Sequence, residues 1–125
     1  MSGEKILLVD DEKDILEYFG KALKREGFRV LTAENGEDSL VLAKRELPDL
    51  IVLDVIMQGM DGGEVAQILR ETKETVNIPV IFLSAAVQEN NEGIVKRYMY
   101  IAKVTPIVQI IAKIKEILRN GRVNG

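Results

Sequence analysis

Short apolar runs alternate along the chain with longer segments in which apolar residues recur at three- and four-residue steps. The runs are typical of β-strands, and the longer segments are typical of α-helices with one apolar side. Strands are predicted over residues 6–9, 28–33, 50–53, 80–83 and 98–102. Helices are predicted around residues 15–23, 39–46, 65–69 and 107–118.

The order of these segments predicts the fold class. Near-continuous apolar runs indicate strands that are buried on both faces, as in a parallel sheet between two helix layers. The alternation therefore predicts an α/β domain with a doubly wound, five-stranded parallel sheet. Residues 88–97, between the predicted strands at 80–83 and 98–102, are polar and poorly patterned. The helix expected between these two strands, the fourth of the fold, is therefore predicted to be short or irregular. Residues 1–125 are interpreted as a single domain, with 119–125 as a tail or the start of a linker.

Polar residues stand where the apolar runs end. Asp10 and Asp11 follow the first run, Asp54 follows the third, Ser84 the fourth and Lys103 the fifth. Right-handed crossovers bring the carboxyl ends of parallel strands to one edge, where sites form in such sheets. Taken singly, each residue has a plain explanation as a helix cap, a turn residue or a surface charge. Together they favour a site, because independent caps need not place acids, a hydroxyl and a lysine at corresponding strand ends.

Composition limits the chemistry of such a site. The 125 residues include no cysteine and no histidine, which excludes thiol chemistry, a Ser-His-Asp triad and a histidine-ligated metal. The formal net charge is -3, so nucleic acid binding by this chain is not expected. No apolar run approaches the roughly 20 residues that span a bilayer, and the first residues lack a secretory signal pattern. A cytoplasmic protein without a membrane segment is therefore expected.

The charges at the sheet edge indicate a hard metal ion. Three carboxylates in close contact repel one another and need a cation or raised pKa values. An all-oxygen cluster suits Mg²⁺ better than zinc. The metal and Lys103 would offset the charge of a phosphoryl group, Asp54 would be the nucleophile, and Ser84 would hydrogen-bond a phosphate oxygen.

Four segments resemble the receiver domains of two-component response regulators. They are Ile-Leu-Leu-Val-Asp-Asp at 6–11, Leu-Asp-Val-Ile-Met-Gln-Gly-Met-Asp-Gly at 53–62, Phe-Leu-Ser-Ala at 82–85 and Tyr-Ile-Ala-Lys at 100–103. The resemblance covers essentially the whole chain and implies the flavodoxin-like receiver fold. It also implies a role in signal transduction as a phosphoprotein with an aspartyl phosphate. The phosphoryl group would come from the histidine of a histidine kinase or a histidine phosphotransfer protein.

The same resemblance implies roles for individual residues. The residues expected to hold Mg²⁺ are Asp10, Asp11, Asp54 and the backbone carbonyl of Ile56. The residues expected to contact the phosphoryl group or to switch with it are Ser84, Lys103 and Tyr100. Phosphorylated Asp54 would draw Ser84 inward, and Tyr100 would follow. The face of the fourth and fifth strand–helix units would then change for a downstream target or an output domain.

Several positions depart from the family's pattern. Gln58 and Val104 stand where proline is usual, and Lys96-Arg97 stand where small residues are usual. Because a cis bond after Lys103 would cost roughly 2.5–4 kcal/mol without that proline, a trans bond is expected. These departures leave open a second interpretation, a receiver-like interaction module with weak or no phosphorylation-driven switching.

Enzymatic turnover and flavin binding have less support in the sequence. A haloacid-dehalogenase-type phosphatase needs a second aspartate two residues after the nucleophile, where this chain has Ile56. A flavodoxin-like flavin carrier needs a hydroxyl- and glycine-rich loop after the first strand, where this chain has Asp10-Asp11-Glu12. Ile56 and Ala86 cannot orient an attacking water, so we expect self-catalysed phosphoryl acceptance, slow hydrolysis and no other enzymatic activity.

Overall fold

The computed structural model describes residues 3–84, 93–95 and 98–124. These residues form three layers, with helices on both faces of one sheet. The strands are β1 (Lys5–Val9), β2 (Arg29–Ala33), β3 (Leu50–Leu53), β4 (Val80–Ser84), β5 (Gly93–Val95) and β6 (Tyr98–Ala102). The helices are α1 (Lys13–Arg25), α2 (Gly36–Glu46), α3 (Gly62–Glu71) and α4 (Ile107–Asn124). None of these described helices is long and apolar enough to cross a membrane.

The sheet has the strand order β2-β1-β3-β4-β6-β5. Its first five members in that order are parallel, which confirms the predicted five-stranded parallel sheet. The short strand β5 pairs antiparallel with β6 at the edge and was not predicted. The predicted short or irregular fourth helix falls largely on residues 85–92 and 96–97, which lie outside the described residues.

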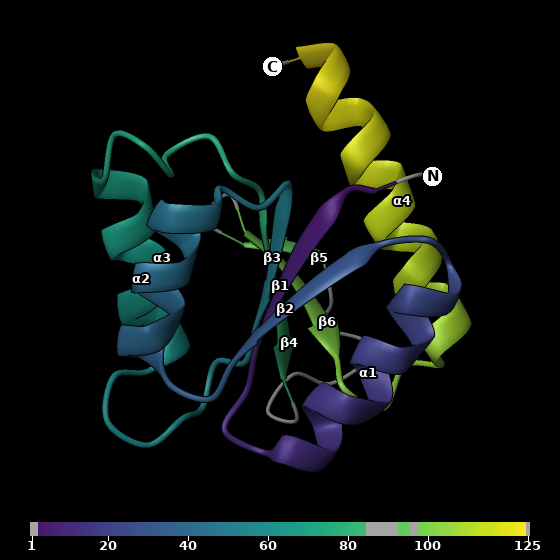
Figure 1. The fold of residues 1–125 in the computed structure, drawn as a ribbon, viewed down its shortest axis with the longest axis horizontal. Coiled ribbons are helices and arrows are strands. Elements are labelled where there is room, and N and C mark those ends of the chain that lie inside the picture. Colours follow the sequence, from purple (N-terminus) through teal and green to yellow (C-terminus); the bar gives the residue numbers. More distant parts are fainter. Residues whose placement is uncertain (1–2, 85–92, 96–97, 125) are drawn as a thin grey trace.

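The period of two along the strands divides the core between two helix layers. Alternate strand residues such as Leu8 and Val52 pack with α1 and α4, while their neighbours Leu7 and Ile51 pack with α2 and α3. Figure 1 shows these two helix pairs on opposite faces of the sheet. Since both faces are covered, β1 and β3 are almost entirely apolar and buried.

Local polar residues determine where two of the helices begin. The side chain of Asn35 accepts a hydrogen bond from the backbone N–H of Asp38 and caps α2. Asp61 and Glu64 form a reciprocal capping box at the start of α3. The start of α3 is therefore held in place beside the end of β3, where the candidate site lies.

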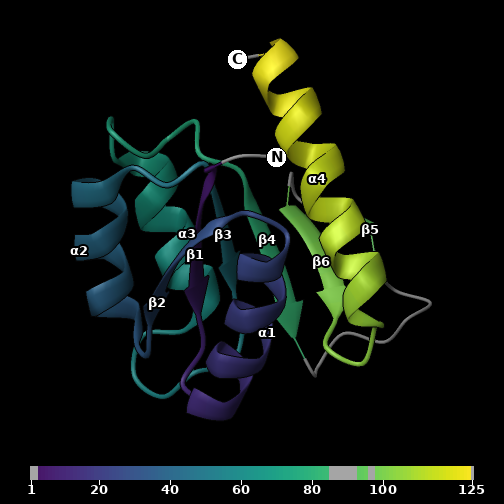
Figure 2. The same ribbon diagram turned by 45° about the vertical axis from the view of Figure 1, so that its right-hand side comes forward.

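The last helix is longer than the apolar pattern predicts. Its buried residues Ile110, Ile114 and Leu118 recur at four-residue steps and pack against α1 and the sheet. The helix continues to Asn124, so residues 119–124, which were interpreted as a tail or the start of a linker, are helical. Figure 2 shows this end of α4 extending past the sheet.

Candidate functional site

The phase of the strands brings three charged residues together at the carboxyl edge of the sheet. Leu8, Val52 and Ile101 all belong to the core on the side of α1 and α4. A residue two places further along a strand points to the same side. The residues at those positions are Asp10, Asp54 and Lys103.

Backbone hydrogen bonds hold these residues against the neighbouring strands. The N–H groups of Asp10, Asp54 and Lys103 donate to the carbonyl oxygens of Ala33, Val9 and Ser84 at 3.2, 3.0 and 3.1 Å, respectively. Each residue follows directly after its strand, so its backbone position is set by the sheet itself. The sheet therefore holds the Cα atoms of all three residues in place.

Lys103 lies at the centre of the acidic residues. Its Nζ is 2.8 Å from Oδ2 of Asp10, 3.3 Å from Oδ2 of Asp54 and 3.5 Å from Oε1 of Glu12. The side chains of Asp10 and Asp54 are only 6% and 5% exposed, whereas that of Glu12 is 64% exposed. The ammonium group therefore compensates two buried carboxylates, and its contact with Glu12 is screened by solvent.

A second acidic group overlaps the first. Carboxylate oxygens of Asp10, Asp11 and Glu12 lie within 4.8 Å of one another, which is close enough to share a cation. Glu12 was not predicted to be part of the site, although it directly follows the acidic pair in the sequence. Among the described residues, Asp54 is not a member of this group and is linked to Asp10 through Lys103.

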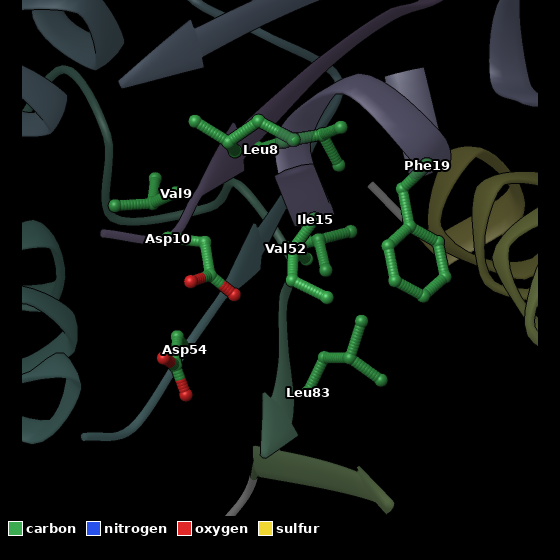
Figure 3. Close-up of a pocket in the computed structure, with 9 residues that line it drawn as sticks. Leu8, Val9, Asp10, Ile15, Phe19, Val52, Asp54 and Leu83 are labelled. Atoms are coloured by element: carbon green, nitrogen blue, oxygen red, sulfur yellow. The ribbon is translucent and has the colours of Figure 1, made fainter. Parts of the chain in front are cut away.

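Asp10 and Asp54 border a small cavity of about 10 Å³ between α1 and the sheet. Figure 3 shows the two carboxylates on one side of this cavity and aliphatic side chains such as Leu8, Ile15 and Leu83 on the other. Burial in this setting, and secondarily the charge of Asp10, raise the pKa of Asp54 above its ordinary value. Lys103 and the N–H of Ile56 oppose this rise without cancelling it.

The pKa of Lys103 is raised, which favours the charged form of its side chain. Burial by itself would lower the pKa of Lys103. The hydrogen bond and charge of Asp10, followed by the charge of Asp54, outweigh burial, so that the pKa lies above its ordinary value. Lys103 is therefore fully protonated at neutral pH and available to an anion at this edge.

We expect Asp54→Asn to raise the free energy of unfolding of the metal-free chain at pH 7 by about 1 kcal/mol, or a few degrees in Tm. The raised pKa of Asp54 means that the folded chain binds this proton more tightly than the unfolded chain. The resulting stabilisation is complete below the unfolded-state pKa and is lost as the pH rises through the folded-state pKa. At pH 7 the folded chain therefore bears the cost of the ionised carboxylate, and asparagine removes that cost.

Urea unfolding from pH 3 to pH 8 measures this difference. The gain from Asp54→Asn should shrink as the pH falls and Asp54 becomes protonated. Glu74→Gln, at an exposed residue between α3 and β4, provides a control and should change stability by less than about 0.5 kcal/mol. A destabilised Asp54→Asn chain at pH 7 would contradict the expectation.

Ser84 and Tyr100 lie on the other face of the sheet. Phe82 and Tyr100 are register partners on β4 and β6, and their rings stack with centroids 4.8 Å apart. Ser84 is two residues after Phe82 on β4, so it shares this face, and it is fully buried. The roles of Ser84 and Tyr100 in switching stay predictions, but the fold places both along the same pair of strands.

The remaining predicted positions lie on loops around this edge. Ile56 is 64% exposed, and its N–H lies 3.4 Å from Oδ1 of Asp54. Val104 is 76% exposed. All peptide bonds of the described residues are trans, which confirms the expectation for Lys103–Val104. Ala86, named with Ile56 in the prediction of slow hydrolysis, lies outside the described residues.

Comparison with known proteins relates this arrangement to one family. The family model described as "Response regulator receiver domain" matches residues 6–115. The chain is 38% identical over 122 residues to the phosphate regulon transcriptional regulatory protein PhoB of Pseudomonas aeruginosa, covering 95% of this chain and 53% of that protein. It is 37% identical over 124 residues to the alkaline phosphatase synthesis transcriptional regulatory protein PhoP of Bacillus subtilis, covering 97% and 51%. The chain thus spans about half the length of these curated relatives.

Solved structures agree with the sequence comparison. The receiver domain of the Francisella response regulator 1452 superposes with a TM-score of 0.80 at 28% identity, covering 94% of this chain and 98% of that one. The sheet and the helix layers of this chain therefore match those of a solved receiver domain of nearly the same size.

Proposed function

The chain belongs to the family of response regulator receiver domains, and we propose that it switches by accepting a phosphoryl group on Asp54. Members of this family act as signalling switches and not as enzymes that turn over a separate substrate. The observation that carries this proposal is the position of Lys103 between Asp10 and Asp54. A cation held within 3.3 Å of an Asp54 oxygen is well placed to offset the charge of phosphate oxygens arriving there.

The donor set at this edge fits Mg²⁺. Asp10, Asp11 and Glu12 present carboxylate oxygens within 4.8 Å of one another, and an all-oxygen set is what this ion prefers. We propose that Asp10 and Asp11 of this group hold the ion together with Asp54 and the backbone carbonyl of Ile56, the two further ligands that the family resemblance implies. When bound, the ion would supply positive charge that offsets the phosphoryl oxygens and the crowded carboxylates.

In the chemical step, the carboxylate of Asp54 reacts with a phosphorylated donor. An Asp54 oxygen attacks phosphorus, the bond from phosphorus to the donor's imidazole nitrogen breaks, and its electron pair returns to that nitrogen. The product is an acyl phosphate on Asp54. Lys103 keeps its proton throughout, since its pKa is raised, and acts as a fixed charge. Exposed Ile56 beside Asp54 offers no group to activate water, which supports slow hydrolysis.

We infer the partners of this chain from its family and from the greater length of its curated relatives. The phosphodonor would be a histidine kinase or a histidine phosphotransfer protein. The conformational change would pass through Ser84 and Tyr100 to the surface near β4 and β6. From there it would act on a downstream protein or on an output domain, since the chain spans only about half the length of its curated relatives. A cytoplasmic location stays a prediction.

A receiver-like module that binds a partner without switching remains the second candidate, because the tight stacking of Phe82 on Tyr100 also suits a static role. Mg²⁺ binding separates the two interpretations. A switch should bind Mg²⁺ in a manner that Asp11→Ala abolishes, whereas a static module has no need of the ion.

We expect the purified chain to gain the mass of one phosphoryl group when incubated with Mg²⁺ and acetyl phosphate. Intact-mass spectrometry measures the gain, which should disappear completely in Asp54→Asn and fall strongly when the metal is chelated. Asp14→Asn, at an exposed acid in the first turn of α1, is the matched control and should still be phosphorylated. No gain, or a gain that persists in Asp54→Asn, would overturn the proposal.

A further inference from the structure

The loop between β3 and α3 donates backbone hydrogen bonds to two of the acidic residues. The N–H of Ile56 lies 3.4 Å from Oδ1 of Asp54, within the same loop. The N–H of Gln58 lies 3.4 Å from Oδ2 of Asp11, which is 47 residues away in the sequence. The second contact therefore joins the end of β1 to a loop on a different strand.

This loop is anchored on both sides of Gln58. The N–H of Gly62 donates to the carbonyl of Val55 at 2.9 Å, which closes the loop on itself. The capping box of α3 begins at Asp61. Gly59 has a φ of +77°, a left-handed conformation that glycine adopts without strain, and it turns the chain back toward α3.

Asp11 needs such a contact more than its neighbours do. Asp10 is buried and paired with Lys103, and Glu12 also reaches Lys103. Asp11 is exposed and lies close to both of these carboxylates. Like-charge repulsion therefore pushes its side chain away from the cluster, and exposure leaves it free to rotate.

We propose that Gln58 is a positioning residue that acts through its main-chain N–H: it holds Asp11 beside the acidic group and so increases the affinity for Mg²⁺. The inference rests on the proposed Mg²⁺ site and adds one residue to it. A donor that fixes Asp11 before the ion arrives lowers the ordering cost of binding. Because the contact uses the backbone, any residue with an N–H can make it, whereas proline has none.

The test is a matched pair of substitutions, Gln58→Pro and Gln58→Ala, compared by calorimetric titration with Mg²⁺ alone. Alanine keeps the N–H and should bind Mg²⁺ like the unaltered chain. Proline removes the N–H and should weaken binding by about three- to tenfold, the scale of one hydrogen bond. Equal affinities of the two variants would overturn the role of Gln58, while no Mg²⁺ binding by the unaltered chain would overturn the proposed function.

A second measurement observes the contact directly and does not depend on whether Gln58→Pro folds. In the metal-free chain, the amide proton of Gln58 should shift upfield in Asp11→Ala, because a hydrogen-bond acceptor has been removed. Glu12→Ala deletes a carboxylate from the same cluster and should leave this resonance nearly unchanged. An amide signal that responds equally to both changes, or to neither, would show that Gln58 does not hold Asp11.

Discussion

Lys103→Met should lower the free energy of unfolding of the metal-free chain by about 3 kcal/mol at pH 7. Methionine keeps an unbranched apolar stem but removes the ammonium group that lies 2.8 Å from Asp10 and 3.3 Å from Asp54. Both carboxylates are nearly fully buried, so neither can recover its charge compensation from water. Removing one partner of a buried ionic group costs far more than removing a surface pair, since an uncompensated charge stays behind.

Urea unfolding of the variant and of a matched control measures this cost. Lys113→Met removes a lysine from a surface pair with Glu116 on α4 and should change stability by less than about 1 kcal/mol. The loss in Lys103→Met should become smaller at acidic pH, because Asp54, whose pKa is raised, takes up a proton. It should also become smaller with millimolar Mg²⁺, if the ion binds these acids as proposed. A loss at pH 7 no larger than that of the control would contradict the central position of Lys103.

Gly62→Ala is the second change with a large expected effect and should lower the free energy of unfolding by about 3 kcal/mol. Gly62 is the first residue of α3 and packs directly on the backbone at the end of β3. A Cβ added there would overlap the carbonyl oxygen of Asp54 and lie 2.9 Å from Cα of Val55. Neither neighbour is a flexible side chain, so α3 or the Asp54 backbone has to move.

The adjacent glycine provides the control for this prediction. Gly63→Ala places a Cβ 3.4 Å from a side-chain oxygen of Asp61, which is an ordinary contact, and alanine favours the helix by up to about 1 kcal/mol. Thermal unfolding should therefore separate the two variants by more than 10 °C, given a few degrees per kcal/mol for a chain of this size. Phosphorylation of the folded fraction should also slow in Gly62→Ala only, because the change displaces Asp54. Two variants of equal stability would show that the close approach of Gly62 is not required.

Much of the fold follows from the sequence because the signals are local. The apolar runs at 6–9, 50–53 and 80–83 agree with β1, β3 and β4, since strands buried on both faces must be continuously apolar. The predicted fifth strand over residues 98–102 agrees with β6. The expectation that run-ending acids and a lysine meet at one edge rested on the parallel sheet alone, and Lys103 does reach Asp10 and Asp54.

Other features depend on contacts between distant segments, which no local pattern contains. The continuation of α4 to Asn124 was missed because its last turns lack an apolar stripe. The antiparallel strand β5 was missed because three residues give no usable periodicity, and their partner strand defines them. Glu12 was missed because its place in the site depends on how close its carboxylate comes to those of Asp10 and Asp11 and to Lys103, which lies 91 residues away in the sequence.

The sequence by itself therefore determined the alternation of strands and helices, the parallel sheet and the acids, hydroxyl and lysine at its carboxyl edge. Hydrophobic burial and strand phase act residue by residue, so these features can be recognised along the chain. Only the tertiary structure decided the strand order, the closer pairing of Lys103 with Asp10 than with Asp54, and the contact of Gln58 with Asp11. Those features depend on distances between side chains and loops that come together only when the separate strands have packed into one sheet.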